Sequence, residues 1–286
     1  MPTSNQTKSL GNINPVSIPI PTPKMIFFDI DDTLSRNGEI APHNKATLEA
    51  LAKSNLDIKL VISTGRSKPI LPLDIQALLA DNVLDAIICM NGQYSFNNQQ
   101  VISDYPLTLG QATTIAGLCV DSALIYKFDS ATHIAWSDSH DWQNRYHDKI
   151  KEVSLIDPEY CQANTVYQCS VFFDDQNEKM QSVDFAKHNL KLVHWHDAIG
   201  DILPVDASKA RGILDVCAHF GIDAADCMAF GDGLNDLEMF DLVGFAVAMG
   251  DAKDELKARA NLITGSIEEQ GIQAVLEPIM RAYVQT

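Results

Sequence analysis

An apolar run near the start of the chain ends in three carboxylates and a hydroxyl. Residues 24–28 are followed by Asp29, Asp31, Asp32 and Thr33. Such a run predicts a buried strand, and Asp29 and Asp31, two positions apart on an extended backbone, would point to the same side. Neighbouring carboxylates repel each other unless a cation or a proton lies between them, and Mg²⁺ favours carboxylate oxygens and water. The stretch therefore predicts acid groups at the rim of a sheet.

A calcium-binding loop is the first alternative for this stretch. In an EF-hand loop that began at Asp29, Leu34 would occupy the glycine position and Ile40 the position of the bidentate glutamate. Neither side chain can serve there, so the stretch fails as an EF-hand. Because acidic turns after strands are common, the choice between a catalytic site and an ordinary turn depends on the rest of the chain.

Polar residues also follow two later apolar runs. Ser63, Thr64, Gly65 and Arg66 end one of them, and a second cluster runs from Asp232 to Asp236. In an open parallel sheet the functional residues gather at the carboxyl ends of the strands. If these strands lie side by side, their polar ends share one crevice.

The order of the surrounding elements predicts a parallel sheet. Apolar residues at helical spacing predict a helix over 42–52, and a strand within 57–66, a helix at 73–79 and a strand at 86–90 follow. Strand, helix and strand at this spacing form a βαβ unit, whose strands run parallel. The alternation returns later, with predicted strands at 201–205, 227–230, 244–249 and 261–264, and predicted helices at 208–220, 237–242, 253–260 and 267–283.

The middle of the chain has a different pattern. Asn97 and Asn98 suit the turn of a hairpin over 94–102, because asparagine tolerates positive φ. Predicted helices at 108–119 and near 178–188 alternate with predicted strands at 123–128 and 165–173. This mixture indicates an inserted domain at 92–196, which leaves a discontinuous core domain of 24–91 and 197–286. The proline-rich residues 1–23 are expected to form a flexible tail.

Composition limits the class of protein and its partners. Of the 286 residues, 46% are hydrophobic and 21% are charged, as in globular proteins. The net charge of −17 argues against nucleic acid as a partner, because phosphate backbones need a basic surface. No run approaches the ~18 apolar residues of a membrane span. The six cysteines are scattered without a Cys-x-x-Cys pair, so we expect buried thiols in a reducing compartment and therefore a cytoplasmic protein. The expected oligomeric state is a monomer or a homodimer.

The polar clusters together meet the demands of phosphoryl transfer. Asp29 would attack phosphorus to form an aspartyl-phosphate, and Asp31 would protonate the leaving oxygen and then activate water. Asp29, Asp232 and the backbone carbonyl of Asp31 would hold Mg²⁺, which clamps a phosphate oxygen. The remaining phosphate oxygens would be bound by the Thr64 hydroxyl, the Gly65 amide and the Lys209 ammonium.

These residues also carry a resemblance to a known family. The chain resembles the haloacid dehalogenase superfamily phosphatases of the Cof type (subfamily IIB, C2-type cap), whose motifs stand here in order. They are Asp29-Ile30-Asp31-Asp32-Thr33, Ile62-Ser63-Thr64-Gly65-Arg66, Lys209 in Asp206-Ala207-Ser208-Lys209-Ala210, and Gly231-Asp232-Gly233-Leu234-Asn235-Asp236. Within the last motif, Asn235 is assigned to phosphate binding, and Asp236 either binds the metal, holds a metal-bound water or pairs with Lys209.

The resemblance implies an α/β fold with a Rossmann-like parallel-sheet core and an inserted α+β cap. The cap would be mobile and would select the substrate, with Asn91-Gly92 and residues 196–200 as its hinges. Two positions depart from the pattern, because Asp32 and Asp251 stand where many relatives have glycine and asparagine. Arg66 is interpreted as a surface residue at a helix start, with substrate binding as the alternative.

We therefore expect a Mg²⁺-dependent phosphomonoester hydrolase that acts on a small phosphorylated metabolite, a sugar phosphate or a phosphorylated cofactor. A phosphotransferase or phosphomutase shares the aspartyl-phosphate step and stays open as an alternative, as does a catalytically silent metabolite-binding protein. A two-component receiver is disfavoured because Asp29 and Lys209 lie on either side of a long insert. A dehalogenase is disfavoured because its metal-free reaction has no use for Asp31 and the metal-binding acids.

Overall fold

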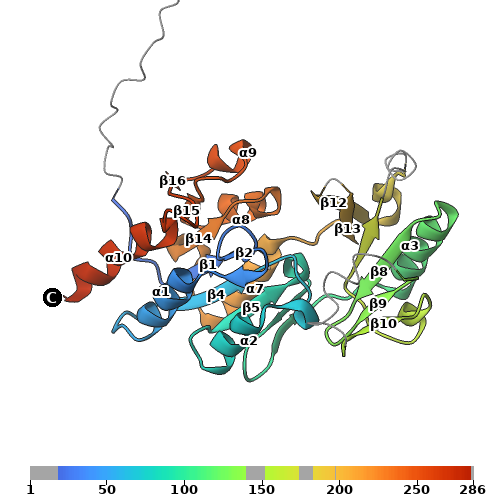
Figure 1. Ribbon diagram of the computed structural model, residues 1–286, viewed down its shortest axis with the longest axis horizontal. Helices are drawn as coiled ribbons and strands as arrows, with labels where there is room; N and C mark the ends of the chain where they lie inside the picture. Colours follow the sequence, from blue (N-terminus) through green and yellow to red (C-terminus); the bar gives the residue numbers. More distant parts are fainter. Residues whose placement is uncertain (1–18, 140–151, 174–182, 197, 285–286) are drawn as a thin grey trace, which may run out of the picture.

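Two β-sheets organise the chain, and each forms the centre of one lobe (Figure 1). The computed structural model describes residues 19–139, 152–173, 183–196 and 198–284. In the view of Figure 1, the larger lobe contains both the beginning and the end of the described chain, and the smaller lobe contains its middle. The active-site candidates of the sequence therefore belong to the larger lobe.

The larger sheet has eight strands in the order β16-β15-β14-β1-β4-β5-β6-β7. The first six in this order are parallel, whereas β6 and β7 continue the sheet as an antiparallel hairpin. Every residue of the central strand β1 is buried, as expected of a strand covered on both faces. The strands are β1 (Met25–Phe28), β4 (Lys59–Ser63), β5 (Ala86–Cys89), β6 (Tyr94–Phe96), β7 (Val101–Asp104), β14 (Cys227–Gly231), β15 (Phe245–Ala248) and β16 (Leu262–Ile263).

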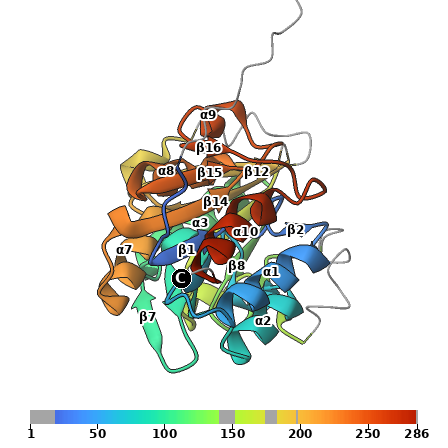
Figure 2. The ribbon, with the colours of Figure 1, turned by 90° about the vertical axis from the view of Figure 1, so that its left-hand side faces the viewer.

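Helices cover both faces of this sheet, with α1 and α10 on one side and α7 on the other (Figure 2). The ends of α7 follow from its sequence, because Ser208 accepts the N–H of Arg211 as N-cap and Gly221 takes the left-handed conformation after the last residue. The helices of this lobe are α1 (Pro42–Ala52), α2 (Leu73–Ala80), α7 (Lys209–Phe220), α8 (Leu237–Leu242), α9 (Asp254–Lys257) and α10 (Gly271–Val284). The short strands β2 (Ser35–Arg36) and β3 (Glu39–Ile40) form a separate hairpin, and 3₁₀ turns occupy Lys68–Ile70, Met90–Gly92, Ala224–Asp226 and Leu234–Asp236.

The smaller sheet has six strands in the order β10-β9-β8-β11-β13-β12. Neighbours are antiparallel except β9 and β10. Within the described ranges, helix α3 (Leu109–Asp121) packs on this sheet and begins with a capping box between Thr108 and Gln111. The strands are β8 (Ile125–Asp129), β9 (Ile134–Trp136), β10 (Ser154–Ile156), β11 (Gln168–Phe172), β12 (Leu190–His196) and β13 (Ile199–Pro204), with 3₁₀ turns at Tyr160–Gln162 and Phe185–His188.

Two elements differ from the sequence-based expectation of where the insert begins and ends. The hairpin β6–β7, expected in the insert, pairs with β5 in the larger sheet. Strand β13, expected in the core, pairs with β11 and β12 in the smaller sheet. Strand β13 was expected in the parallel sheet because a helix follows it. Its pairing with two antiparallel strands, β11 and β12, places it in the smaller sheet instead.

Two other expectations fall partly on residues outside the described ranges. The expected helix near 178–188 is described only from residue 183, where a 3₁₀ turn covers Phe185–His188. The expected tail is described only from residue 19, and Ile20 packs against the core of the larger lobe. The last part of this proline-rich segment is therefore attached to the larger lobe.

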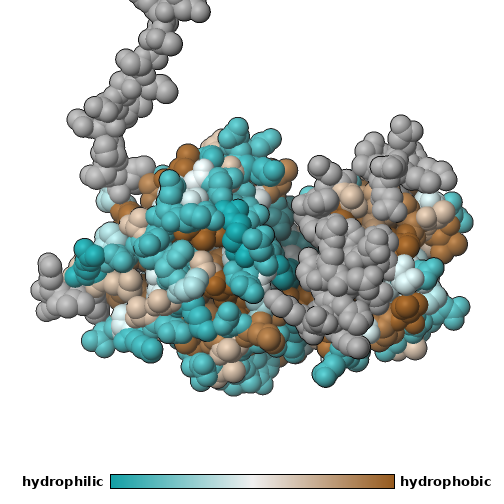
Figure 3. All heavy atoms as spheres, viewed as in Figure 1, coloured by the Kyte–Doolittle hydropathy of each residue, from teal (hydrophilic) through white to brown (hydrophobic). Residues whose placement is uncertain are grey.

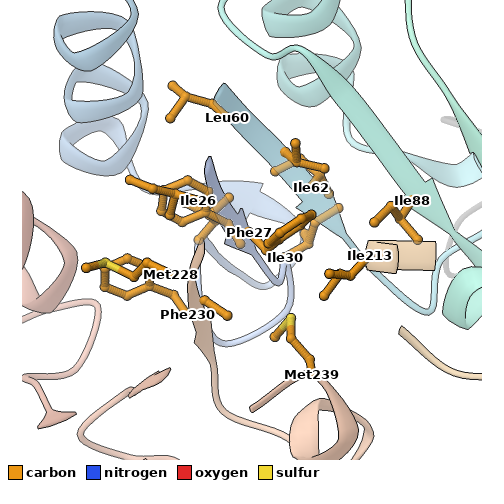
Figure 4. Packing of buried hydrophobic residues seen from close by; sticks show 14 of the residues in the cluster. Ile26, Phe27, Ile30, Leu60, Ile62, Ile88, Ile213, Met228, Phe230 and Met239 are labelled. Atoms are coloured by element: carbon orange, nitrogen blue, oxygen red, sulfur yellow. The ribbon is translucent and has the colours of Figure 1, made fainter. Parts of the chain in front are cut away.

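Side chains from β1, β4, β5, β14, α7 and α8 form the apolar core of the larger lobe (Figure 4). The rings of Phe28 and Phe230 stack at a centroid distance of 5.3 Å, directly before the polar residues that follow β1 and β14. Burying a phenylalanine stabilises a fold by roughly 2–3 kcal/mol. Closely packed aromatic rings therefore support the polar residues that follow both strands.

The visible face of the larger lobe is largely hydrophilic (Figure 3), in keeping with the net charge of −17. All six cysteines are buried free thiols. Within the described ranges, none of the helices combines the length and the apolar character that crossing a membrane requires.

Candidate active site

Strands β1 and β14 bring two carboxylates to the same edge of the larger sheet. The strands are parallel neighbours in which Phe28 lies opposite Phe230. The backbone N–H of Asp29 donates to the carbonyl of Phe230 at 3.1 Å. Asp29 directly follows β1 and Asp232 directly follows β14, so both lie at the carboxyl edge, where open parallel sheets place their sites.

A buried lysine joins two acids of this edge. Lys209, the first residue of α7, is 0% exposed. Its Nζ donates to Oδ1 of Asp29 at 2.5 Å and to Oδ1 of Asp236 at 2.6 Å. Burial alone lowers the pKa of a lysine, but the carboxylates of Asp236 and Asp29 outweigh it, so the pKa of Lys209 is raised. Lys209 is therefore a cation at neutral pH.

Three carboxylates crowd around the same point. Asp29, Asp232 and Asp236 each offer an oxygen within 4.8 Å of the other two. Burial raises the pKa of Asp29 well above its usual value; Lys209 opposes this, and Asp236 and Asp232 reinforce it. Burial and the charge of Asp236 raise the pKa of Asp232 to about 7. One lysine does not balance three acids, so a cation or protons must supply the remaining positive charge.

The loop after β14 is shaped by Asp236. Its Oδ2 accepts the backbone N–H groups of Asp232 and Gly233, both at 3.0 Å. Of the roles left open by the sequence, Asp236 pairs with Lys209 and also offers an oxygen to the acidic cluster. Thr33, to which the sequence analysis assigned no role, donates its hydroxyl to Oδ1 of Asp232 at 2.9 Å. The position of Thr33 in the first motif could have indicated a role for it at the site.

Asp31 lies in different surroundings from Asp29. Strand β1 ends at Phe28, so extended alternation does not continue to Asp31, whose side chain is 51% exposed. Its carboxylate accepts hydrogen bonds from Nε and Nη2 of Arg66 at 2.8 and 2.6 Å and is not one of the three clustered carboxylates. The interpretation of Arg66 as a mere surface residue was wrong, because its two N–H groups hold the predicted acid–base residue.

The turn after β4 carries the predicted phosphate-binding groups. Thr64 is 1% exposed, and its Oγ1 accepts the backbone N–H of Arg66 at 3.1 Å. Asn91, with a φ of 50°, donates its N–H to the carbonyl of Thr64 at 3.1 Å. The Oδ1 of Asn91 accepts Nδ2 of Asn235 at 3.3 Å, and the Asn91 side chain lies beside Gly65. Asn91, expected only as a hinge residue, thus links the two predicted phosphate-binding segments.

The acidic cluster fits a hard divalent cation. All of its ligand atoms are carboxylate oxygens, which Mg²⁺ and Ca²⁺ prefer. A cation between Asp29 and Asp232 would favour their ionised forms and so offset the effect of burial on their pKa values. A bound divalent cation would therefore supply the positive charge whose shortage raises the pKa values of Asp29 and Asp232.

Comparison with known proteins identifies the family to which most of the chain is similar. The sequence profile of the haloacid dehalogenase-like hydrolases matches residues 26–276. YkrA of Bacillus subtilis, a protein named as a phosphatase, is 30% identical over 87% of this chain and 95% of its own. Pyridoxal phosphate phosphatase YbhA of Escherichia coli is 28% identical over 85% and 94%. A Streptococcus pyogenes protein named as a bifunctional phosphatase and peptidyl-prolyl cis-trans isomerase is 30% identical, but the chain spans only 54% of its length.

Solved structures include a similar fold. The subclass IIB sugar phosphatase BT4131 superposes with a TM-score of 0.75 at 29% identity, covering 90% of this chain and 98% of that one. Relatives that are similar to this chain in sequence or in fold are thus phosphatases by name. The chain belongs to the haloacid dehalogenase-like hydrolase family and is a phosphatase of the Cof type.

Proposed function

We propose that this phosphatase is a Mg²⁺-dependent phosphomonoester hydrolase that works through an aspartyl-phosphate on Asp29. The observation that carries the proposal is the surroundings of Asp29. Asp29 is 6% exposed, and its carboxylate is bonded to the Lys209 ammonium and lies within 4.8 Å of the oxygens of Asp232 and Asp236. The Lys209 ammonium, together with a cation held by these carboxylates, would let Asp29 approach an anionic phosphate that it would otherwise repel.

The metal-binding residues in this proposal are Asp29, Asp232 and Asp236, with the Asp31 backbone carbonyl as a further ligand. When bound, Mg²⁺ neutralises charge on a phosphate oxygen and on the carboxylates around it. Lys209 supplies a second, permanent positive charge, bonded directly to Asp29. These groups support the ionised form of Asp29 that a nucleophile requires.

The chain's own residues then account for both half-reactions. An oxygen of Asp29 forms a bond to phosphorus while the phosphorus–leaving-group bond breaks, and Asp31 gives its proton to the leaving oxygen. In the second half, Asp31 takes a proton from water, the water oxygen bonds to phosphorus, and Asp29 is released with orthophosphate. Arg66 orients Asp31 for these transfers through its two hydrogen bonds. Thr64, Gly65 and Asn235 bind the phosphate oxygens.

The proposed substrate is a small phosphorylated metabolite, a sugar phosphate or a phosphorylated cofactor. Two relatives support these classes by their names, one a sugar phosphatase and the other a pyridoxal phosphate phosphatase. With a net charge of −17, the protein offers little attraction to large polyanions, so the local cations of the site select a small anion.

The test is phosphate release from p-nitrophenyl phosphate and a panel of sugar and cofactor phosphates, with Mg²⁺ and with a chelator. We expect turnover that the chelator abolishes and that Asp232→Asn lowers by about a hundredfold or more, because the variant removes one ligand charge. Asp226→Asn, a surface aspartate paired with Lys24, is the control and should keep full activity. Turnover that survives both the chelator and Asp232→Asn would refute the metal-dependent proposal.

A further inference from the structure

A polar strip of the smaller sheet contacts the phosphate-binding turn. Phe128 and Cys169 pack into the apolar cluster that includes α3, which lies on the side of this sheet away from the larger lobe (Figure 1). Their sequence neighbours Lys127, Asp129 and Gln168 therefore point the other way, because side chains alternate along a strand. This second face meets the larger lobe at the turn after β4.

Two side chains of this face hold that turn. Nε2 of Gln168 donates to the carbonyl of Gly65 at 3.2 Å, and the hydroxyl of Ser67 donates to Oδ1 of Asp129 at 3.1 Å. Nε2 of Gln168 also donates to Oδ2 of Asp129 at 3.0 Å, and Nζ of Lys127 bonds the same oxygen at 2.6 Å. The five residues, all buried except Gly65, form one network that spans both lobes.

Within the described part of the chain, the Gln168 side chain acts as a hydrogen-bond donor only. The residue is 2% exposed, and its Oε1 accepts no hydrogen bond within the described part of the chain. A buried amide with an unused acceptor costs stability that an apolar side chain would not cost. Its Nε2, by contrast, has two acceptors, one in each lobe.

The contact continues to the predicted acid–base residue. The carbonyl of Gly65 belongs to the Gly65–Arg66 peptide, so Gln168 fixes the peptide from which Arg66 extends. The guanidinium of Arg66 in turn holds both oxygens of Asp31. We infer that Gln168, supported by Asp129, is a positioning residue: it docks the smaller lobe on the phosphate-binding turn and, through Arg66, sets the place of Asp31.

The inference rests on the proposed function and predicts which substrates suffer when the contact is lost. In Gln168→Met the side chain keeps its size but loses both donors. A misplaced Asp31 matters most where the leaving oxygen needs a proton, since general acids act on poor leaving groups. We expect kcat/KM, which reports the step up to release of the leaving group, to fall about tenfold or more for the best sugar phosphate of the panel. For 2,4-dinitrophenyl phosphate it should fall less than about threefold.

Gln273→Met is the matched control. Gln273 is also buried, at 6% exposure, and its Nε2 also has two acceptors, Asn44 and Thr47, but it joins α10 to α1 and is not part of the Gln168 network. This variant should leave the ratio of the two kcat/KM values unchanged. Ser67→Ala, which removes one bond of the network without changing the sheet, should shift the ratio in the same direction as Gln168→Met. Equal losses for both substrates in Gln168→Met, or none, would overturn the inference.

A second measurement needs no turnover. Amide hydrogen exchange in peptides covering residues 64–67 should quicken in Gln168→Met relative to both wild type and Gln273→Met, because the turn loses its contact with the smaller lobe. Unchanged exchange there would also overturn the inference. A wild-type protein that releases no phosphate, but in which Gln168→Met speeds this exchange, would instead count against the proposed function alone.

Discussion

At the scale of single residues, charge imbalance defines the site. Lys209 is fully buried between Asp29 and Asp236, with Asp232 beside them. Buried charges are tolerated when they are paired, and here three acids share one lysine. The imbalance is the physical reason why the site is suited to a divalent cation.

This imbalance makes the effect of Mg²⁺ depend on pH. The pKa of Asp232 is raised from 3.8 to about 7 by burial and Asp236, so the folded metal-free protein holds a proton that the unfolded chain loses at lower pH. Between these values the metal-free protein loses stability as pH rises. Metal binding must displace such protons, at a cost of about 1.4 kcal/mol per proton for each pH unit below the raised pKa.

We therefore expect Mg²⁺ to raise the melting temperature more at about pH 8 than at about pH 5.5, by about 3 °C or more. Thermal denaturation with Mg²⁺ or with a chelator at both pH values measures this difference. Asp232→Asn should remove most of the pH dependence of the Mg²⁺ effect. Equal stabilisation by Mg²⁺ at both pH values would contradict this account of the cluster.

The residue types of the site could be predicted from the sequence, but several of their pairings could not. Acids after apolar runs pointed to Asp29 and Asp232, and the motif order pointed to Lys209. The bond between Arg66 and Asp31 depends on how two loops turn after their strands end. A pattern along the chain contains no information on that geometry, so the partner of Asp31 was missed.

At the scale of elements, local patterns predicted type better than partnership. The expected helix over 42–52 coincides with α1, and Ser208 and Gly221 bound α7 as their capping preferences suggest. The hairpin β6–β7 and strand β13 were recognised as strands but placed in the wrong sheet. Alternating apolar residues predict a half-buried strand and leave open the sheet that it joins.

One glycine shows how closely two elements approach near the site. Gly92 has a φ of 86°, and a Cβ built there would lie 1.9 Å from the carbonyl oxygen of Ser208, the residue before Lys209. Gly92→Ala must therefore displace the start of α7. We expect it to lower the free energy of unfolding by about 2–4 kcal/mol. We also expect it to lower kcat/KM by about tenfold or more, because Lys209 moves.

Gly117→Ala is the control for that prediction. Gly117 lies within α3, and nothing stands within 4 Å of a Cβ added there. Alanine at this exposed helical position should stabilise by about 0.5–1 kcal/mol and leave phosphate release unchanged. Chemical denaturation and steady-state kinetics of both variants measure the two effects. A Gly92→Ala protein as stable and active as Gly117→Ala would show that α7 is not held as described.

At the scale of the whole molecule, the active-site edge is assembled from distant parts of the chain. Asp29 and Lys209 are separated in sequence by all six strands of the smaller sheet, yet their side chains are bonded. The α/β class and the presence of an insert could be predicted from the alternation of elements. The docking of the smaller lobe through Gln168 and Asp129 could not, because it depends on two surfaces that meet only in the folded protein.

The central claim, that Asp29 carries the phosphoryl group, has a direct test. The Mg²⁺-loaded enzyme is mixed with an excess of its best substrate, quenched in acid within milliseconds, digested and analysed by mass spectrometry. We predict that the peptide containing Asp29 gains the mass of one phosphoryl group, and that Asp29→Asn shows neither this adduct nor turnover. Steady turnover by Asp29→Asn, or a phosphoryl group found on another residue, would contradict the account.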